Sequence, residues 1–555
     1  MPAPIDPVTS ALTGHLTFHL LLAAVLTWPI AMALLRLYTR AVRRSMRSQA
    51  HAVQPGVSRP TDVMASDSHG RPAGTRVATL HDLPEASASA AAEGLLTRLI
   101  ARPRHAAMVY AVAGSAYAVV IAAAALLADG LEILPLRFLF LFWTFAWPIV
   151  PTVGIVAATT RRTRIAMTAI YFLGLVIIGA IEMPRSPDLT WPQVFTPWVL
   201  YDLPATILLL TYLSRRIRAV GPLILTFILL ALIGSDVVVT VAGSQDSYLR
   251  AIVRMAGSVG LGGSGAFVAL LAIGFLLFAV LGWAALVWIG RRYQAKKISD
   301  ESVTVDALWM LFTVVHSMDL VFGHPLWTLA GPVAFAAYKV CARAGFSWLG
   351  RADDLSEKSP ALLVLRSFSI GSDSERLFDV VGRHWRRVGS IQMIAGIDLV
   401  SRTVDPHEFL DFTSGKLSRR FIESPAALEQ RMRERDTRPD RDLRFRVNDF
   451  FCYDDTWKMV LSRLVDESDA VLMDLRGFSR QNAGCVFELH ELVRLVPLEQ
   501  VVFIVDRRTD EALLAETLGD RRAGVLRLGP MNGPQVRQLL RAMAAAATPA
   551  AANAA

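Results

Sequence analysis

Two carboxylic acids, Asp474 and Glu488, are the residues of this chain whose types and spacing suit chemistry. Asp474 ends an apolar run, and Glu488 lies after a short polar loop, in the first or second turn of an amphipathic run. Two carboxylates that face one crevice tend to retain a proton between them, which suits general acid work. The sequence therefore predicts Glu488 and Asp474 as catalytic residues. In the simpler interpretation, Glu488 only stabilises the dipole of its helix.

Residues that could hold a ligand lie near these acids. Asn482 and Gly484 would place a tight turn and free backbone N–H groups at the start of the helix, where phosphate binds readily. Arg366 and Ser367 end an earlier apolar run and could bind phosphate or a protein partner. A surface ion pair at the end of a strand is the alternative role for Arg366.

Metal and nucleic-acid chemistry find little support. The acidic and histidine side chains just after residue 404 fit a helix start at Pro406. The three cysteines have no paired spacing, so we predict no metal and no cofactor. The charged run 431–446 mixes arginine with acids, which predicts a solvated loop within a charged insertion, 423–446. Nucleic acid is therefore not an expected partner, despite a net charge of +9.

The elements that must position these residues begin after residue 359, where short apolar runs alternate with amphipathic stretches. Strands are expected at 361–368, 391–397, 470–475, 501–506 and 524–528, and helices at 374–388, 456–465, 483–495 and 534–543. This alternation predicts an α/β domain with a parallel sheet that is covered by helices on both faces. Ligands bind such sheets at the carboxyl ends of the strands. The residues there are Arg366, Ser367, Phe368, Asp398, Asp474, Arg476, Gly477 and Asp506.

The rest of the chain is strongly apolar, since 53% of all residues are hydrophobic and most of these precede residue 345. A spanning helix needs about 20 apolar residues. Seven spans are expected, at 16–38, 106–128, 138–159, 165–181, 198–213, 222–243 and 266–290. Every second connection is rich in arginine and lysine, which predicts that these connections and the C-terminal domain are cytoplasmic. The expected location is the bacterial inner membrane, with the lipid bilayer as a partner.

The predicted domains are a membrane anchor (1–47), a disordered cytoplasmic linker (48–95), a six-span region (96–297) and the α/β domain (359–543), followed by a disordered tail (544–555). Residues 298–358 are either an interfacial hairpin or two further spans, which would make nine. The hairpin is favoured because Asp306, His316 and Asp319 are costly at membrane depth. Asp236 is the best candidate for an ion or proton site within a span.

The stretch 469–490, DAVLMDLRGFSRQNAGCVFELH, resembles two related families. It is similar to nucleoside deoxyribosyltransferases and to TIR domains, in which a strand and a loop precede a helix with a glutamate near its start. The resemblance implies a flavodoxin-like or TIR-like sheet. It also implies that Glu488 attacks or stabilises an anomeric carbon while an N-glycosidic bond breaks, with Asp474 as the acid at the strand end.

Three functions follow as expectations. The leading one is a membrane-anchored signalling or defence protein whose TIR-like domain acts through protein partners or homo-oligomers. The alternative is a membrane-tethered hydrolase that cleaves NAD or a nucleotide with Glu488, so whether the chain is an enzyme stays open. A transporter or channel regulated by the domain rests only on the number of spans and on Asp236.

Overall fold

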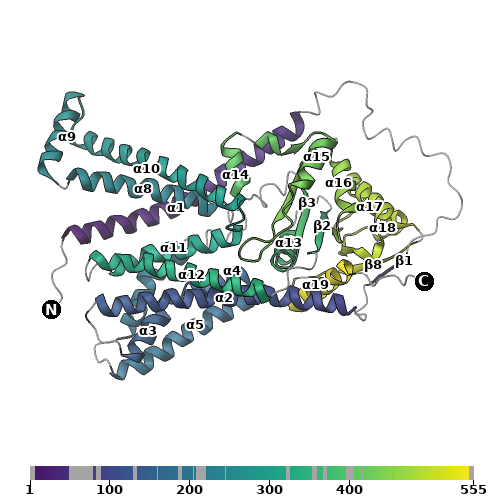
Figure 1. Ribbon diagram of the computed structural model, residues 1–555, viewed down its shortest axis with the longest axis horizontal. Coiled ribbons are helices and arrows are strands. Elements are labelled where there is room, and N and C mark those ends of the chain that lie inside the picture. The colour runs from purple at the N-terminus through teal and green to yellow at the C-terminus, as the bar shows by residue number, and fades with distance from the viewer. Residues whose placement is uncertain are drawn as a thin grey trace. The chain divides into compact units, whose positions relative to one another are not determined.

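The structure is a computed structural model, which describes residues 7–48, 79–82, 89–128, 130, 134–158, 160–185, 190–203, 205–207, 220–243, 245–320, 325–352, 359–366, 372–395, 406–415, 417–453, 456–519, 521–529 and 531–548. The chain forms two compact units (Figure 1). The helical unit comprises Met1–Tyr38, Ala107–Trp348 and Ser401–Gly415. The α/β unit comprises Thr39–Ala106, Leu349–Val400 and Lys416–Ala555.

Among the described residues, four helices are long and apolar enough to cross a membrane. They are α2 (Ala90–Ala128), α5 (Arg161–Glu182), α8 (Gly221–Gly243) and α10 (Gly263–Gln294). The seven predicted spans are therefore not confirmed as a set. The predicted span 16–38 lies within one continuous helix, α1 (Pro7–Ser48), and two other predicted spans differ in their geometry.

The predicted span 138–159 is a bent pair of helices. The axes of α3 (Pro135–Phe145) and α4 (Ile149–Val156) meet at 44°. Pro148 lies at the break. Because proline has no N–H and disfavours helical geometry in the residue before it, the helical hydrogen bonds are interrupted there. The pair makes a fifth candidate span only if its two helices are taken together.

The predicted span 198–213 also departs from a regular helix. The short α6 (Trp191–Pro197) continues as a π-helical turn, η2 (Trp198–Asp202). In the sequence, Pro197 precedes this turn and Pro204 follows it. Proline has no N–H group, so the regular pattern of backbone hydrogen bonds of an α-helix cannot continue through this segment. Residues 208–213 lie outside the described residues. The turn leaves Asp202 buried in the helical unit.

Residues 298–358 were expected to form an interfacial hairpin or two spans. The structure has α11 (Asp300–Leu320), a turn η3 (Pro325–Leu329) and α12 (Ala330–Ala352). Helix α11 packs inside the helical unit, with Trp309 fully buried against Gly114 of α2, where a Cβ would lie 2.7 Å from the indole. The buried His316 has hydrogen-bonding partners, so the cost that favoured the hairpin is largely offset.

The helices α9 (Asp246–Ser258) and α14 (Pro406–Thr413) complete the helical unit. Helices α8 and α10 approach closely at glycines: a Cβ on Gly274 would lie 2.6 Å from the backbone oxygen of Gly234. Small residues allow such approach in lipid, where no hydrophobic force drives helices together. Much of α10 stays exposed, including Leu276, Leu277 and Val280, as expected of a helix that faces lipid or another helix.

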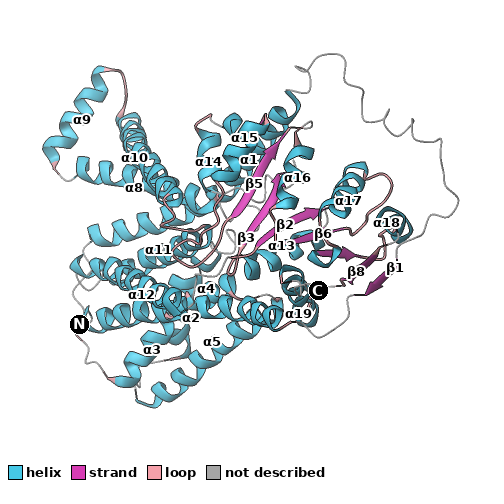
Figure 2. Ribbon diagram, turned by 45° about the vertical axis from the view of Figure 1, so that its right-hand side comes forward, coloured by secondary structure: helices cyan, strands magenta, loops and turns pink. Residues whose placement is uncertain are grey.

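The α/β unit contains one parallel sheet of eight strands among its described residues (Figure 2). They are β1 (Thr79–Asp82), β2 (Ala361–Arg366), β3 (Ser390–Ala395), β4 (Phe421–Ile422), β5 (Val447–Cys452), β6 (Ala470–Asp474), β7 (Val501–Val505) and β8 (Arg522–Arg527). Their order is β1-β8-β7-β6-β2-β3-β5-β4. The five predicted strands and their parallel arrangement are thus confirmed.

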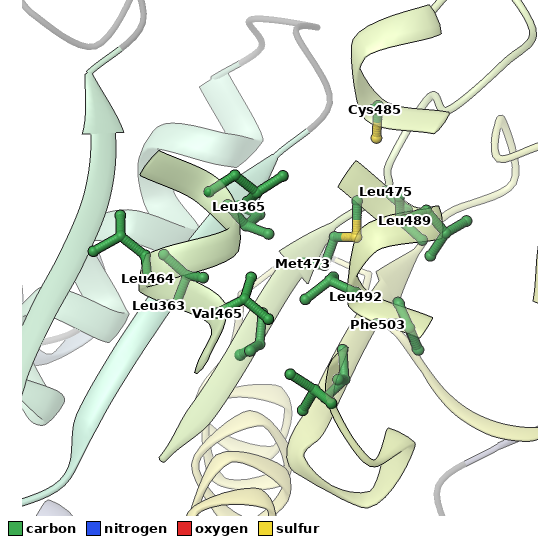
Figure 3. Close-up of a cluster of buried hydrophobic side chains, with 14 of the residues drawn as sticks. Leu363, Leu365, Leu464, Val465, Met473, Leu475, Cys485, Leu489, Leu492 and Phe503 are labelled. Atoms are coloured by element: carbon green, nitrogen blue, oxygen red, sulfur yellow. The ribbon is translucent and has the colours of Figure 1, made fainter. Parts of the chain in front are cut away.

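Side chains alternate between two cores, one on each face of the sheet. Leu363, Leu365 and Met473 pack with α16 (Trp457–Asp466), α17 (Ala483–Leu495) and α18 (Glu511–Leu518), as Figure 3 shows for part of this cluster. Leu362 and Val364 pack with α13 (Ser372–Trp385), α19 (Gly533–Ala547) and the first turns of α2. Shorter helices η4 (Leu417–Arg420), α15 (Pro425–Arg433) and η5 (Leu498–Gln500) join the other elements. A parallel sheet covered on both faces explains why its strands are uninterrupted apolar runs.

Three predicted segments differ from the structure. The linker 48–95 contains an ordered strand, β1, which pairs with β8, and α2 already begins at Ala90. The tail 544–555 begins inside α19, where Ala544 and Ala546 are buried. The charged run 431–446 is not a solvated loop, because its Asp440 and Arg446 are buried as an ion pair.

Candidate functional site

The strand order reverses between β2 and β6. From β2 the chain passes through α13 to β3 on one side, whereas β6, β7 and β8 follow one another on the other side. Helix α13 covers one face and α17 covers the opposite face. The crevice outside the carboxyl ends of two such strands is where doubly wound sheets bind ligands. The site is therefore built from the residues that follow β2 and β6.

Asp474, the last residue of β6, is held by a bidentate pair with Arg476. The Arg476 Nε and Nη2 atoms each donate to one carboxylate oxygen at 2.7 Å, and both residues are buried. Ser374, near the start of α13, donates its hydroxyl to the Asp474 Oδ2 atom at 3.1 Å. The Nη2 atom of Arg476 also lies 3.3 Å from that hydroxyl. The three side chains thus join the end of β6 to the start of α13 across the point of strand reversal.

The turn after β6 is fixed by Asp506, the residue that directly follows β7. Gly477 has a φ of +72°, which glycine adopts without strain. Its N–H donates to the Asp506 Oδ1 atom at 3.0 Å. Burial alone would raise the pKa of Asp506, but the Gly477 N–H and the Arg508 side chain and N–H outweigh it, and the pKa lies below its ordinary value.

This depressed pKa predicts an acid sensitivity. The folded pKa of Asp506 lies below the unfolded value of about 3.9, so its contribution to stability is present above that pH and is lost as the pH falls through the folded pKa. Asp506→Asn should therefore flatten the decline in melting temperature below about pH 4. Scanning calorimetry of the full chain checks this. Asp466→Asn is the exposed control, and an equal flattening in both variants would contradict the role of Asp506.

Glu488 lies on α17, and only 7% of it is exposed. Its near neighbour Cys485 is fully buried. Burial raises the pKa of the Cys485 thiol, and the nearby carboxylates of Glu488 and Asp474 raise it further. The structure therefore brings Cys485 close to both predicted acids, in an environment that keeps the thiol protonated.

The remaining predicted residues are placed only in part. Asn482 immediately precedes α17, and its Oδ1 atom accepts from the Ser479 N–H and hydroxyl at 3.0 and 3.1 Å, so that this atom already shapes the loop. Gly484 lies in the first turn of α17. Arg366 pairs in register with Asp474. The Arg366 side chain, Ser367, Phe368 and Asp398 lie outside the described residues.

Ser374 and Cys485 are the site residues that the sequence did not reveal. Ser374 carries a weak signal, since it follows a strand and begins an amphipathic stretch, but nothing local links it to Asp474, 100 residues away. Cys485 lies inside the stretch that carries the family resemblance. In comparisons with known proteins, no family model, no curated protein and no solved structure matches the chain.

Proposed function

We propose that this chain is a membrane-anchored signalling or defence protein whose α/β unit is a TIR-like effector module in the cytoplasm. The observation that carries the proposal is the polar cluster Ser374–Asp474–Arg476 at the point of strand reversal. The strands β3, β2, β6, β7 and β8 also lie in the flavodoxin-like order 2-1-3-4-5, which places ligands at that point. The four apolar helices support attachment to a membrane.

The cluster suggests how a ligand would change the module. Arg476 is held by a planar two-pronged pair, and phosphate offers the same geometry to a guanidinium group. A phosphate-bearing nucleotide that took Arg476 from Asp474 would also weaken the contact between Ser374 and Asp474. The start of α13 would then be released, and its surface would change for a protein partner or a second copy of the chain.

Hydrogen exchange of the full chain in lipid nanodiscs tests this response. With NAD or ADP-ribose as the probe, exchange of the peptide that covers α13 should change in the wild type. Arg476→Lys keeps the charge but loses the two-pronged geometry, and it should lose most of the change. Arg480→Lys is the matched control, because Arg480 is exposed in the same loop. No change at α13 with either nucleotide would contradict the proposed module.

A second function, cleavage of an N-glycosidic bond, is favoured by the burial of Glu488 beside Cys485. In this mechanism a carboxylate oxygen of Glu488 attacks the anomeric carbon of NAD. The bond to nicotinamide breaks with its electron pair leaving on the base, and water later releases the sugar and restores the carboxylate. A carboxylate removed from bulk water is a stronger electrostatic partner for the positive transition state.

Nicotinamide release from NAD by the full chain decides this alternative. Glu488→Gln should reduce the rate by about a hundredfold or more, the scale of losing a catalytic carboxylate, while the melting temperature stays near that of the wild type. Glu491→Gln is the matched control, since Glu491 lies on the same helix and accepts hydrogen bonds from the side chains of Ser462 and Arg494. Nicotinamide release that persists in Glu488→Gln, or no nicotinamide release by the wild type, would contradict the hydrolase function.

A further inference from the structure

A chain of three ionisable side chains lies in the interior of the helical unit. The Nε2 atom of His316 on α11 lies 3.2 Å from the Asp202 Oδ1 atom, and the His316 Nδ1 atom lies 3.0 Å from the Tyr117 hydroxyl on α2. Tyr117 and His316 are 0% exposed and Asp202 is 1% exposed. We propose that these residues form a proton-binding site in the helical unit, in which His316 takes up the proton.

The surroundings make this cluster unusual. The ring of His316 packs edge-on against Phe145, with a centroid distance of 4.8 Å, and Tyr117 packs against Trp309 at 5.0 Å. Asp202 ends the π-helical turn, a distortion that often marks functional sites. Ionisable groups buried in a helical membrane protein are costly and commonly belong to proton relays or sensors. A purely structural role would be served as well by groups that cannot ionise.

The hydrogen bonds define two states of the site. In the neutral state, the imidazole carries its proton on Nε2, and this N–H donates a hydrogen bond to Asp202. The Nδ1 atom accepts a hydrogen bond from the Tyr117 hydroxyl. When Nδ1 binds a proton, the imidazolium faces the Asp202 carboxylate, and the Tyr117 oxygen must accept instead. The Tyr117 hydroxyl hydrogen then needs another acceptor, and the nearby Thr313 hydroxyl oxygen, whose own hydrogen goes to the Trp309 backbone oxygen, can provide one. Proton uptake therefore reverses the hydrogen bond that joins α2 to α11.

Other charged groups near the cluster are few among the described side chains. Tyr171 of α5 is close enough to Asp202 to interact electrostatically with it, and its hydroxyl donates to the Thr144 oxygen. Asp306 of α11 pairs with Lys339 of α12 and also accepts from Tyr338. Helices α3 and α4 contribute no acid to the surroundings. The side chains of Asp236 on α8 and Asp319 on α11 lie outside the described part.

Nitrogen NMR of the full chain in nanodiscs, with labelled histidine, tests the site. The His316 signal is the one lost in His316→Gln, and imidazole nitrogen shifts distinguish the neutral from the charged ring. As the pH is lowered from about 8 to about 5, the wild-type signal should change reversibly from the neutral to the charged form, because the Asp202 carboxylate faces the ring. A ring that stays neutral, or stays charged, across this range would overturn the proposal.

Variants distinguish proton uptake that depends on Asp202 and Tyr117 from proton uptake by His316 alone. At a pH where half of the wild-type signal has changed, Asp202→Asn should leave His316 almost wholly neutral, because the opposing charge is gone. Tyr117→Phe should act in the same direction, since Nδ1–H loses its acceptor. Asp306→Asn is the matched control on the same helix and should leave the signal unchanged. Equal signals in Asp202→Asn and the wild type would overturn the assignment of Asp202, and unchanged chromatographic behaviour establishes that each variant is folded.

Discussion

Replacing Asp440 by alanine should lower the free energy of unfolding of the α/β unit by about 3–5 kcal/mol, as is typical when one partner of a buried ion pair is removed. Arg446 donates to both carboxylate oxygens of Asp440, at 3.0 and 2.8 Å, and the side chains are 4% and 1% exposed. Asp436 also accepts from Arg446, at 3.1 Å, but it is more exposed. Without Asp440, Arg446 would remain buried with only part of its charge compensated.

Native-state hydrogen exchange of the full chain measures this loss. Exchange in the central strands β6 and β7 requires opening of the whole unit, so their slowest amides report its stability. Those amides should exchange more than a hundredfold faster in Asp440→Ala, since about 1.4 kcal/mol corresponds to a factor of ten. Asp466→Ala is the control, because Asp466 is 71% exposed in its pair with Arg463 and should cost about 1 kcal/mol or less. Similar losses in both variants would contradict a special role for burial.

The Asp440–Arg446 pair shows why the prediction of a solvated loop at 431–446 is wrong. A run of mixed charges is usually solvated, and no local pattern shows that its members meet inside a fold. Here Arg386 and Arg387, which directly follow α13, donate to the backbone oxygens of Phe445 and Asp442. The insertion is thus held against an element about 55 residues earlier in the chain. Such pairing depends on tertiary structure, which periodicity does not encode.

The central strands could be predicted because burial on both faces leaves a continuous apolar run, as in β6 and β7. The strands at and near the two edges of the sheet could not be predicted. The edge strand β4 has only two residues, and its neighbour β5 has the polar residues Asn448 and Asp449 directly after Val447. Strand β1 comes from a segment whose composition is typical of a linker, and only its pairing with β8 makes it a strand. Edge strands depend more on a neighbour than on their own residues.

Part of the candidate site could also be predicted from the sequence. A strand end followed by a turn placed Asp474, Arg476 and Gly477 correctly at the carboxyl edge, because all of these lie within one short stretch. The contact with Ser374 could not be foreseen, since it requires that β2 and β6 be neighbours. In the helical unit, only the packing of α11 brings His316 to Asp202, and nothing in the sequence near either residue indicates this contact.

The predicted α/β domain, 359–543, omits the first turns of α2, which belong to its core. Leu95, Leu96 and Leu99 are buried in the cluster that contains Leu362 and Trp385. The Leu99 oxygen also accepts from the His384 ring, and Arg102 donates to the Arg387 oxygen. Residues far from the sheet in sequence thus supply part of one face, and a fragment that lacks them leaves apolar surface uncovered.

Leu99→Ala in the full chain should therefore destabilise the α/β unit by about 2–5 kcal/mol, the range for truncating a fully buried leucine. The backbone oxygen that bonds His384 is kept, so the loss reports side-chain packing alone. The slowest amides of β2 and β7 should exchange about thirtyfold to several thousandfold faster, at about 1.4 kcal/mol for each factor of ten. Leu495→Ala is the matched control, since Leu495 ends α17 with 38% of its surface exposed and should change the exchange little. If Leu99→Ala leaves these amides at the wild-type rate, α2 contributes no stability to the sheet, and the segment 360–543 should then unfold cooperatively by itself.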